Sequence, residues 1–550
     1  MNRNVESHFS LNPTNIDIQR STFDRSHSVK FSFNVGDLIP FYVDEVLPGD
    51  TFNVTSSKVV RMQPLVTAPM DNLFLDIYYF FVPNRLVWSH WREFNGENTD
   101  SPWVPTVEYS VPQLLFTEDT QAFSGSIADY MGIPPVPTGT AKGFSVNALP
   151  FRAYALICNE WFRDENLTDP LVIPTGDANQ PAATKADSIL PPVYALGGIP
   201  FKVAKYHDYF TSCLPTPQKG PDVTIPMATD VPVYSGATIN PAPEGNRYST
   251  LFTNTYDANP QLKYKMDSSG MFEQGAVGDT AGLAVGNLYA AMSTSALATI
   301  NQLRLAFQIQ KLYEKDARGG TRYIEILKSH FGVTSPDARL QRPEYLGGNR
   351  IPINVSQVVQ NSGTVSNSTP QGNVAGMSLT ADNHSDFTKS FVEHGFVIGV
   401  MCARYDHTYQ QGIERFWSRK TRFDYYWPVF ANIGEQPVLN KEIYADGSAA
   451  DDEVFGYQEA WADYRYKPNR VCGEMRSNIT NSLDVWHFAD NYKSRPALSD
   501  SWIREDKTNV DRVLAVQSSK SNQLFADIYI KNKTTRPMPL YSVPGLIDHH

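Results

Sequence analysis

The chain has 550 residues, of which 41% are hydrophobic and 12% aromatic, with 38 prolines and 34 glycines. Its 47 basic and 58 acidic residues give a formal net charge of -11, which excludes a protein that condenses nucleic acid through its overall field. The length exceeds what one compact core usually supports, and no Gly/Ser-rich or Pro-rich spacer divides the chain, so we expect a single core with long excursions.

Residues 1–28 are polar and predict an extended N-terminal arm. Strand-like segments follow at 29–35, 40–46 and 51–62, separated by turn residues. Residues 73–82 are almost all large and apolar, with a single charged residue, and large side chains occupy both alternating sets of positions. Such a run predicts a central strand that is covered on both faces.

Four helices are expected next. Asn84 follows Pro83 and predicts a capped helix that runs through Phe94. A second helix is expected from about residue 147 to 168, and a third from about 293 to 319. The third has apolar residues on two stripes, which predicts burial on two sides, and a short helix at 323–330 follows it.

Between the second and third helices, residues 215–285 are rich in Gly, Asn, Thr, Ser and Pro and predict a large surface excursion. Strand character returns at 391–404, 422–429, 512–517 and 523–531. In the last segment apolar and polar residues alternate, which suits a strand with one wetter face. Strands at both ends of the chain predict a barrel closed by distant segments, as in jelly rolls.

The sequence offers little evidence of catalysis or of metal binding. No metalloprotease, nucleophile-elbow, phosphate-loop or dinucleotide-binding motif is present, so we expect no catalytic residues and no cofactor. Four cysteines lie far apart and predict neither a zinc ribbon nor a disulfide framework. His549 and His550 are two terminal histidines, which are more often simply exposed than bound to a metal, so we expect no metal site. No apolar run has the length of a signal peptide or membrane span, so we expect no membrane insertion and assembly inside a cell.

The run at 415–427, RFWSRKTRFDYYW, alternates basic and aromatic side chains. Basic groups neutralise phosphates and flat rings stack on unpaired bases, which is typical of single-stranded DNA contacts. In the alternative interpretation, which we favour, the rings are core and interface anchors and the cations form surface ion pairs. The candidates for DNA contact are Arg415, Trp417, Arg419, Lys420 and Arg422.

Four stretches resemble the major capsid protein of gokushoviruses, a branch of the microviruses. They are DIYYFFVPNRLVWSHWREFNG, ALPFRAYALICNEWFRDENL, FGYQEAWADYRYKPNRVCGEMR and PLYSVPGLIDHH. The resemblance implies an all-β core with helical and loop insertions, formed by an eight-stranded antiparallel jelly-roll barrel over 29–550. It also implies a structural protein that builds a T=1 icosahedral shell around the circular single-stranded DNA genome of a bacteriophage.

The same resemblance implies the partners. Copies of the chain would form pentamers and the icosahedral shell, with help from an internal scaffolding protein, a small basic DNA-binding protein and a minor pilot protein. Assembly would occur in the host bacterial cytoplasm, and the mature protein would reside in the virion. The acidic balance of the chain agrees with a separate basic partner that neutralises DNA.

In this family a surface insertion forms protrusions at the three-fold axes, which are thought to meet a bacterial host receptor. The excursion at 215–285 takes that position. Its aromatic residues are expected either in the trimer seam, which we favour, or at the receptor contact. The candidates are Tyr234, Tyr248, Phe252, Tyr256 and Tyr264.

Two other protein classes share an expected jelly roll or loop-rich architecture. A secreted carbohydrate-binding lectin requires an export signal, and a loop-rich glycosidase requires a convergent pair of carboxylates. The missing signal and the missing catalytic motifs weigh against both classes.

Overall fold

The computed structural model describes residues 19–97, 107–117, 120, 122–135, 143–185, 191–223, 300–320, 323–332, 341–362 and 371–541, with four short strands between 233 and 290. The chain separates into two compact units. Unit 1 comprises 1–217 and 319–550, and unit 2 comprises 218–318. Most of the predicted excursion at 215–285 therefore belongs to the smaller unit.

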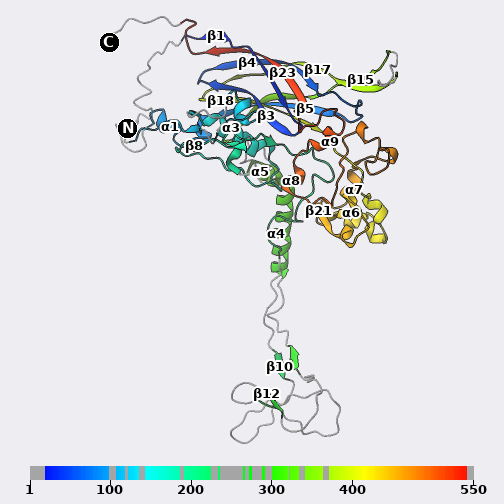
Figure 1. Cartoon of the computed structure of the whole chain (residues 1–550). Helices are drawn as coiled ribbons and strands as arrows, with labels where there is room; N and C mark the ends of the chain where they lie inside the picture. The colour runs from blue at the N-terminus through cyan, green and yellow to red at the C-terminus, as the bar shows by residue number, and fades with distance from the viewer. Residues whose placement is uncertain are drawn as a thin grey trace, which may run out of the picture. The chain divides into compact units, whose positions relative to one another are not determined.

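The first sheet of unit 1 has five antiparallel strands and lies at the top of Figure 1. Its order is β1-β23-β4-β17, and β2 also pairs with β23. The pairing of β1 with the end of β23 places strand structure inside the segment predicted as an extended arm. The strands are β1 (Ser21–Asp24), β2 (His27–Phe33), β4 (Thr51–Met62), β17 (Thr380–Ser390) and β23 (Leu524–Arg536).

The second sheet is also antiparallel, with the order β14-β5-β18-β3-β9. The sequence does not predict β14 or β17, because β14 contains glycines and β17 is mostly polar. A Cβ at Gly347 of β14 would lie 2.3 Å from the Asp386 carbonyl oxygen of β17, so glycine permits this close approach. The strands are β3 (Asp37–Val46), β5 (Leu73–Pro83), β9 (Phe201–Lys202), β14 (Glu344–Pro352) and β18 (Gly395–Tyr405).

The central strand β5 is covered on both faces, which confirms the prediction. Leu75, Ile77 and Tyr79 are 0% exposed and lie in a core that residues of both sheets share. Phe80 and Val82 lie in a second core, on the opposite face of the second sheet. Because β5 lies between β14 and β18, neither of its edges is free.

Asp76, the only charged residue of β5, is 1% exposed. Its carboxylate oxygens lie 2.8 Å from Arg350 Nε of β14 and 2.5 Å from Arg404 Nη2 of β18. The Tyr206 hydroxyl donates to it at 2.7 Å. Burial raises the pKa of Asp76, but the two arginines and Tyr206 outweigh burial and lower it. The charge therefore joins three neighbouring strands instead of weakening the central one.

The first sheet buries only one face. On β23 the apolar residues Leu524, Ala526, Ile528 and Ile530 are buried, and the residues between them are exposed, as their alternation predicts. The same alternation holds along β4. The inward apolar residues of both strands join the shared core, so the two sheets of unit 1 form a sandwich.

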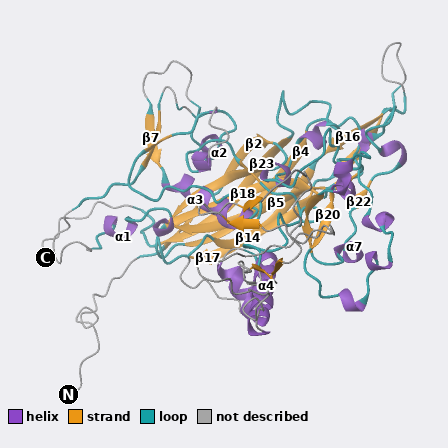
Figure 2. Cartoon of the chain, turned by 90° about the horizontal axis from the view of Figure 1, so that it is seen from below, coloured by secondary structure: helices purple, strands orange, loops and turns teal. Residues whose placement is uncertain are grey.

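A layer of helices and loops covers the outer face of the second sheet. Helix α3 (Leu149–Ile157) continues into a π-helical turn (Cys158–Phe162), so the predicted second helix is confirmed but ends earlier. Tyr154 is 0% exposed, and its hydroxyl donates to the Leu38 carbonyl oxygen of β3 at 2.7 Å. Figure 2 shows α3 against the strands of this sheet.

The predicted helix at 84–94 is wrong. A 3-10 turn (Asn84–Leu86) and a short helix α1 (Trp91–Phe94) replace it. Trp88 lies between the two pieces, is 0% exposed and donates from Nε1 to Asp177 Oδ1 at 2.7 Å. Burial of this indole in the second core therefore overrides the helical pattern.

The predicted strand at 512–517 is also wrong. Helix α9 (Thr508–Asp511) precedes it, and turns follow. Arg512 donates to the carbonyl oxygens of Asp484, His487 and Ala489 at 2.9–3.0 Å. These bonds hold the segment against a distant loop and not in a sheet.

Smaller elements complete unit 1, and a third apolar cluster lies among the later ones. The helices and strands are β6 (Gln113–Phe116), α2 (Ile127–Tyr130), β7 (Phe144–Asn147), β8 (Gln180–Pro181), α5 (Tyr323–Phe331), β15 (Val355–Val359), β16 (Val374–Ser378), β19 (Thr408–Tyr409), β20 (Gln436–Leu439), α6 (Asn440–Ile443), β21 (Val454–Gln458), α7 (Ala462–Arg465), β22 (Asn469–Arg470) and α8 (Asp500–Ile503).

Unit 2 contains helix α4 (Ile300–Gly319) except for its last residue, Gly319, which belongs to unit 1. The prediction that α4 is buried on two sides is wrong for the single chain, because Leu305 and Phe307 are each 60% exposed and Leu312 is 48% exposed. Two strand pairs lie in the same unit: β10 (Val233–Ser235) with β13 (Leu288–Ala290), and β11 (Tyr264–Met266) with β12 (Phe272–Gln274). None of the helices in the described part of the chain is long and apolar enough to cross a membrane.

Candidate functional site

The predicted strand at 422–429 is wrong, and the basic and aromatic run folds as tight turns instead. Two 3-10 turns lie in the run, Arg415–Ser418 and Arg422–Asp424, and a third follows it at Pro428–Phe430. Asp424 Oδ2 accepts the backbone N–H groups of Lys420 and Thr421 at 2.8 and 2.7 Å. These hydrogen bonds lower the pKa of Asp424 and compete with strand formation.

Two of the DNA-contact candidates are held by the protein itself. The Arg419 guanidinium forms an ion pair with Asp463 and lies 4.3 Å from the Tyr464 ring centroid. Arg415 Nη1 donates to the Pro437 carbonyl oxygen at 2.7 Å and lies 3.6 Å from Glu442 Oε1. The positive charges of Arg415 and Arg419 are therefore balanced by carboxylates of the same chain. These contacts hold the run against the neighbouring segments.

The other three candidates face outward. Trp417 is 71% exposed, and Lys420 and Arg422 are also exposed. Arg422 lies over the Phe423 and Trp427 rings, with its guanidinium 5.3 and 6.0 Å from their centroids. Among the residues that the structure describes, neither Lys420 nor Arg422 forms an ion pair.

Around them lies a set of exposed rings, which we call the aromatic surface. Each of its rings is at least 41% exposed, although aromatic side chains normally lose most of their area on folding. An apolar area of this kind is a mark of an interaction site. The aromatic surface comprises Phe416, Trp417, Phe423, Tyr425, Tyr426, Trp427, Tyr464 and Tyr466.

Two hollows of about 260 and 340 Å³ lie beside the aromatic surface and share Phe210, Glu414, Glu442 and Pro468 in their walls. The first also has Arg415, Arg419 and Asp463 in its wall. Its acidic and basic side chains are paired with one another, so the hollow carries no strong field for a charged ligand.

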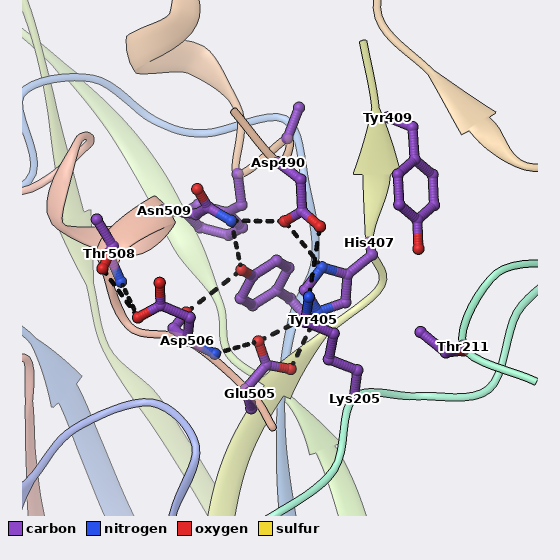
Figure 3. Close-up of polar contacts among 12 residues, drawn as sticks. Lys205, Thr211, Tyr405, His407, Tyr409, Asp490, Glu505, Asp506, Thr508 and Asn509 are labelled. Atoms are coloured by element: carbon purple, nitrogen blue, oxygen red, sulfur yellow. Dashed lines mark hydrogen bonds and ion pairs between the residues drawn. The ribbon is translucent and has the colours of Figure 1, made fainter. Parts of the chain in front are cut away.

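A buried charged cluster lies elsewhere in unit 1 and is drawn in Figure 3. His407 is held between two carboxylates: Nδ1 lies 3.0 Å from Asp490 Oδ1, and Nε2 lies 3.2 Å from Glu505 Oε1. Lys205 Nζ lies 3.6 Å from Asp490 Oδ2. Burial lowers the pKa of His407, but the two carboxylates outweigh burial and raise it to about 10.

This cluster is structural and not catalytic. The side chains of His407, Asp490 and Glu505 are at most 3% exposed, which leaves no face for a substrate. Asn509 Nδ2 donates to Asp490 Oδ1 at 2.6 Å and to the Tyr405 hydroxyl at 3.0 Å. The cluster therefore joins the end of β18 to loops near 490 and 505. Sequence reasoning missed it, because its members are scattered along the chain.

The structure describes two of the five aromatic candidates in the excursion at 215–285. Tyr234 lies on β10 opposite Tyr289 of β13, and Tyr264 lies on β11 opposite Gln274 of β12. Tyr248, Phe252 and Tyr256 lie outside the described residues. His549 and His550 also lie outside them, and within the described part no group of three His, Cys, Asp or Glu side chains is placed to hold a metal ion.

Comparison with known proteins identifies the family to which the chain belongs. Residues 12–546 match the model of a family described as capsid protein (F protein). Capsid protein VP1 of Bdellovibrio phage phiMH2K is 44% identical over 536 residues, which cover 96% of this chain and 95% of the relative. Capsid protein VP1 of Chlamydia phage 1 is 41% identical over 98% of each chain, and that of Spiroplasma virus 4 is 42% identical over 96% of each chain.

A two-sheet sandwich with long insertions, matched over nearly its whole length by capsid proteins, defines a structural protein of the virus shell class. The chain belongs to the family of phage capsid proteins, in its gokushovirus-type branch, as the four sequence stretches predict. It is a component of the virion that assembles with copies of itself, and its role is structural, not enzymatic.

Proposed function

We propose that copies of this chain form a closed T=1 icosahedral shell around a circular single-stranded DNA genome, and that its sandwich is an eight-stranded jelly roll. The strand order supports the jelly roll: the eight long strands divide into β2-β23-β4-β17 and β3-β18-β5-β14. The first and last of these strands are neighbours, as expected when a barrel closes through distant segments.

The aromatic surface is the observation that carries the self-assembly proposal. Tryptophan, tyrosine and arginine dominate the energetics of protein interfaces, and here they lie together and exposed on a capsid protein. We assign the aromatic surface to the contact between neighbouring copies. Contact of Trp417, Lys420 and Arg422 with DNA is the alternative, and Arg415 and Arg419 are already committed to Glu442 and Asp463.

Purified protein is expected to form closed particles, or pentameric pieces of them, that negative-stain microscopy and sedimentation detect. The double variant Trp417→Ser/Tyr425→Ser is expected to remain unassembled, because both rings would be buried only in the contact between copies. Its Tm should equal that of the wild type, since both side chains are exposed in the single chain.

The matched control is Val392→Ser, which removes an 80% exposed apolar side chain outside the aromatic surface. It should assemble normally. Normal particles from the double variant would remove the aromatic surface from the shell contacts. Wild-type protein that stays monomeric and binds a polysaccharide would instead favour the lectin alternative.

Assembly is proposed to involve an internal scaffolding protein, a small basic DNA-binding protein and a minor pilot protein. The net charge of -11 supports a separate basic partner, because the chain's overall field repels DNA. Unit 2 is proposed as the surface protrusion that clusters at the three-fold axis and meets the host receptor. The exposed Leu305, Phe307 and Leu312 of α4 support burial against copies of the same unit.

Replacement of residues 240–275 by a brief Gly/Ser linker is expected to leave particles intact but unable to adsorb to the host. The segment belongs to unit 2 and not to the sandwich, and a change in loop length alters closure entropy only slightly. Particle yield and adsorption to host cells are the two measurements. Failure to assemble would place the segment in the framework of the shell, and normal adsorption would place attachment elsewhere.

A further inference from the structure

The outward face of the first sheet is bare. On β23 Phe525 is 40% exposed and Tyr529 is 48% exposed, and Lys531 and Lys533 follow on the same face. No described helix packs on this side of the sheet, whereas helices cover the second sheet on the opposite side of the sandwich (Figure 1). We call this exposed side of β2, β23, β4 and β17 the outer sheet face.

Strand register places polar side chains around these rings. Tyr529 lies opposite Ser57 of β4 and Ser28 of β2. Lys531 lies opposite Thr55, and Lys533 opposite Asn53. Further serine, threonine and asparagine residues continue the exposed side of β17. The face is therefore rich in hydrogen-bonding groups and has two rings on the internal strand β23, roughly 14 Å apart along the strand.

The charge of the outer sheet face is opposite to that of the whole chain. It carries Lys30, Arg61, Lys531 and Lys533 against one acid, Asp527, with Asp24 beside it on the edge strand β1, while the chain has a net charge of -11. Lys30 Nζ lies 3.3 Å from Asp527 Oδ1. Among the described residues, Arg61, Lys531 and Lys533 form no ion pair.

The pKa of Asp24 responds to this local field. It lies below its usual value because Ser26 donates hydrogen bonds to the carboxylate and because Lys533 and Lys531 lie near. The positive field thus reaches the edge strand β1 and is not confined to the two lysines themselves.

A sheet face that combines exposed rings, unpaired cations and many small polar side chains suits a single-stranded nucleic acid. Rings stack on unpaired bases, cations contact phosphates, and sheets with aromatic residues on their middle strands bind single strands in this way. We propose that the outer sheet face binds the enclosed single-stranded DNA, with Phe525 and Tyr529 stacked on bases and Arg61, Lys531 and Lys533 at phosphates. The choice of DNA as the polymer rests on the proposed function.

The test uses the full-length protein and a short labelled oligothymidylate, with binding measured by fluorescence anisotropy across a range of salt concentrations. Lys531→Gln/Lys533→Gln is expected to weaken binding and to lower the slope of log affinity against log salt by about 1.4, since each phosphate contact contributes about 0.7. Tyr529→Ala is expected to weaken binding about tenfold with little change in that slope, because it removes stacking and not charge.

The matched control is Lys420→Gln/Arg422→Gln, which neutralises the same number of exposed cations on the aromatic surface. It should bind the oligonucleotide with wild-type affinity and slope. All variants alter exposed side chains, so an unchanged Tm confirms that each is folded.

The outcomes separate the inference from the proposed function. The site would be overturned if the variants in β23 bound the oligonucleotide as well as the wild type while the control variant bound it more weakly. That result would assign DNA binding to the aromatic surface. If the wild-type protein bound no oligothymidylate, both this site and any DNA contact by the chain would be overturned. The proposed shell would still be tested separately, by particle formation. Variants that bind normally but fail to form particles would show that a second copy covers the outer sheet face.

Discussion

Protein that carries Ile77→Asp is expected not to accumulate in soluble form. Ile77 is 0% exposed and lies in the core that both sheets share, so the substitution places an unpaired carboxylate among apolar side chains. Burial of such a group costs several kcal/mol, at least about 4 by analogy with other buried charges. Native proteins are stable by only about 5–15 kcal/mol, so a cost of this size removes a large share of the stability. The measurement is the soluble yield and the Tm of any folded fraction.

The control for Ile77→Asp is Val392→Asp, which introduces the same carboxylate at a position that is 80% exposed. That variant should match the wild type in yield and Tm. Soluble, assembly-competent Ile77→Asp protein at wild-type yield would contradict the assignment of β5 to the core.

The second large effect concerns pH. Folding raises the pKa of His407 from 6.5 to about 10, so its contribution to stability is complete below pH 6.5 and is lost as the pH rises towards 10. Burial raises the pKa of Asp490, but His407 and Lys205 outweigh burial and lower it. Its contribution is therefore present above the pKa of an unfolded aspartate, about 3.9, and lost at lower pH. The cluster stabilises the fold most between these limits.

His407→Gln is expected to lower the free energy of unfolding at pH 6 by about 3–5 kcal/mol, because it leaves two buried carboxylates with only one nearby lysine. It should also flatten the decline in stability between pH 6.5 and 10. Denaturant unfolding at several pH values measures both effects. His207→Gln, at an exposed histidine, is the control. A variant with wild-type stability and the same pH profile would mean that His407 is neutral in the folded protein.

Local patterns were sufficient for the long strands. The predicted segment 51–62 coincides with β4, and the alternation in β23 correctly separates buried from exposed side chains. The continuous apolar run of β5 likewise predicts a strand covered on both faces. These predictions succeed because successive side chains of a strand point to opposite faces. The hydrophobicity of alternate residues therefore indicates which face is buried.

Local patterns failed at the basic and aromatic run. Residues 422–429 are strand-like, yet the Asp424 carboxylate accepts backbone N–H groups three and four residues earlier and folds the segment into turns. Of the four cationic candidates for DNA contact, Arg415 and Arg419 are paired with Glu442 and Asp463, and Lys420 and Arg422 are exposed. No spacing in the sequence distinguishes the two pairs.

The sequence by itself determined the family, most of the long strands and the central position of β5, because motifs and side-chain periodicity are properties of neighbouring residues. Only the tertiary structure decided which charges are buried and paired and which remain available. The ion pair between His407 and Glu505 joins residues 98 positions apart, and that between Asp76 and Arg404 joins residues 328 positions apart. No local pattern in the sequence marks such contacts. The same holds for the outer sheet face, whose basic and aromatic residues come from both ends of the chain and meet only through strand pairing.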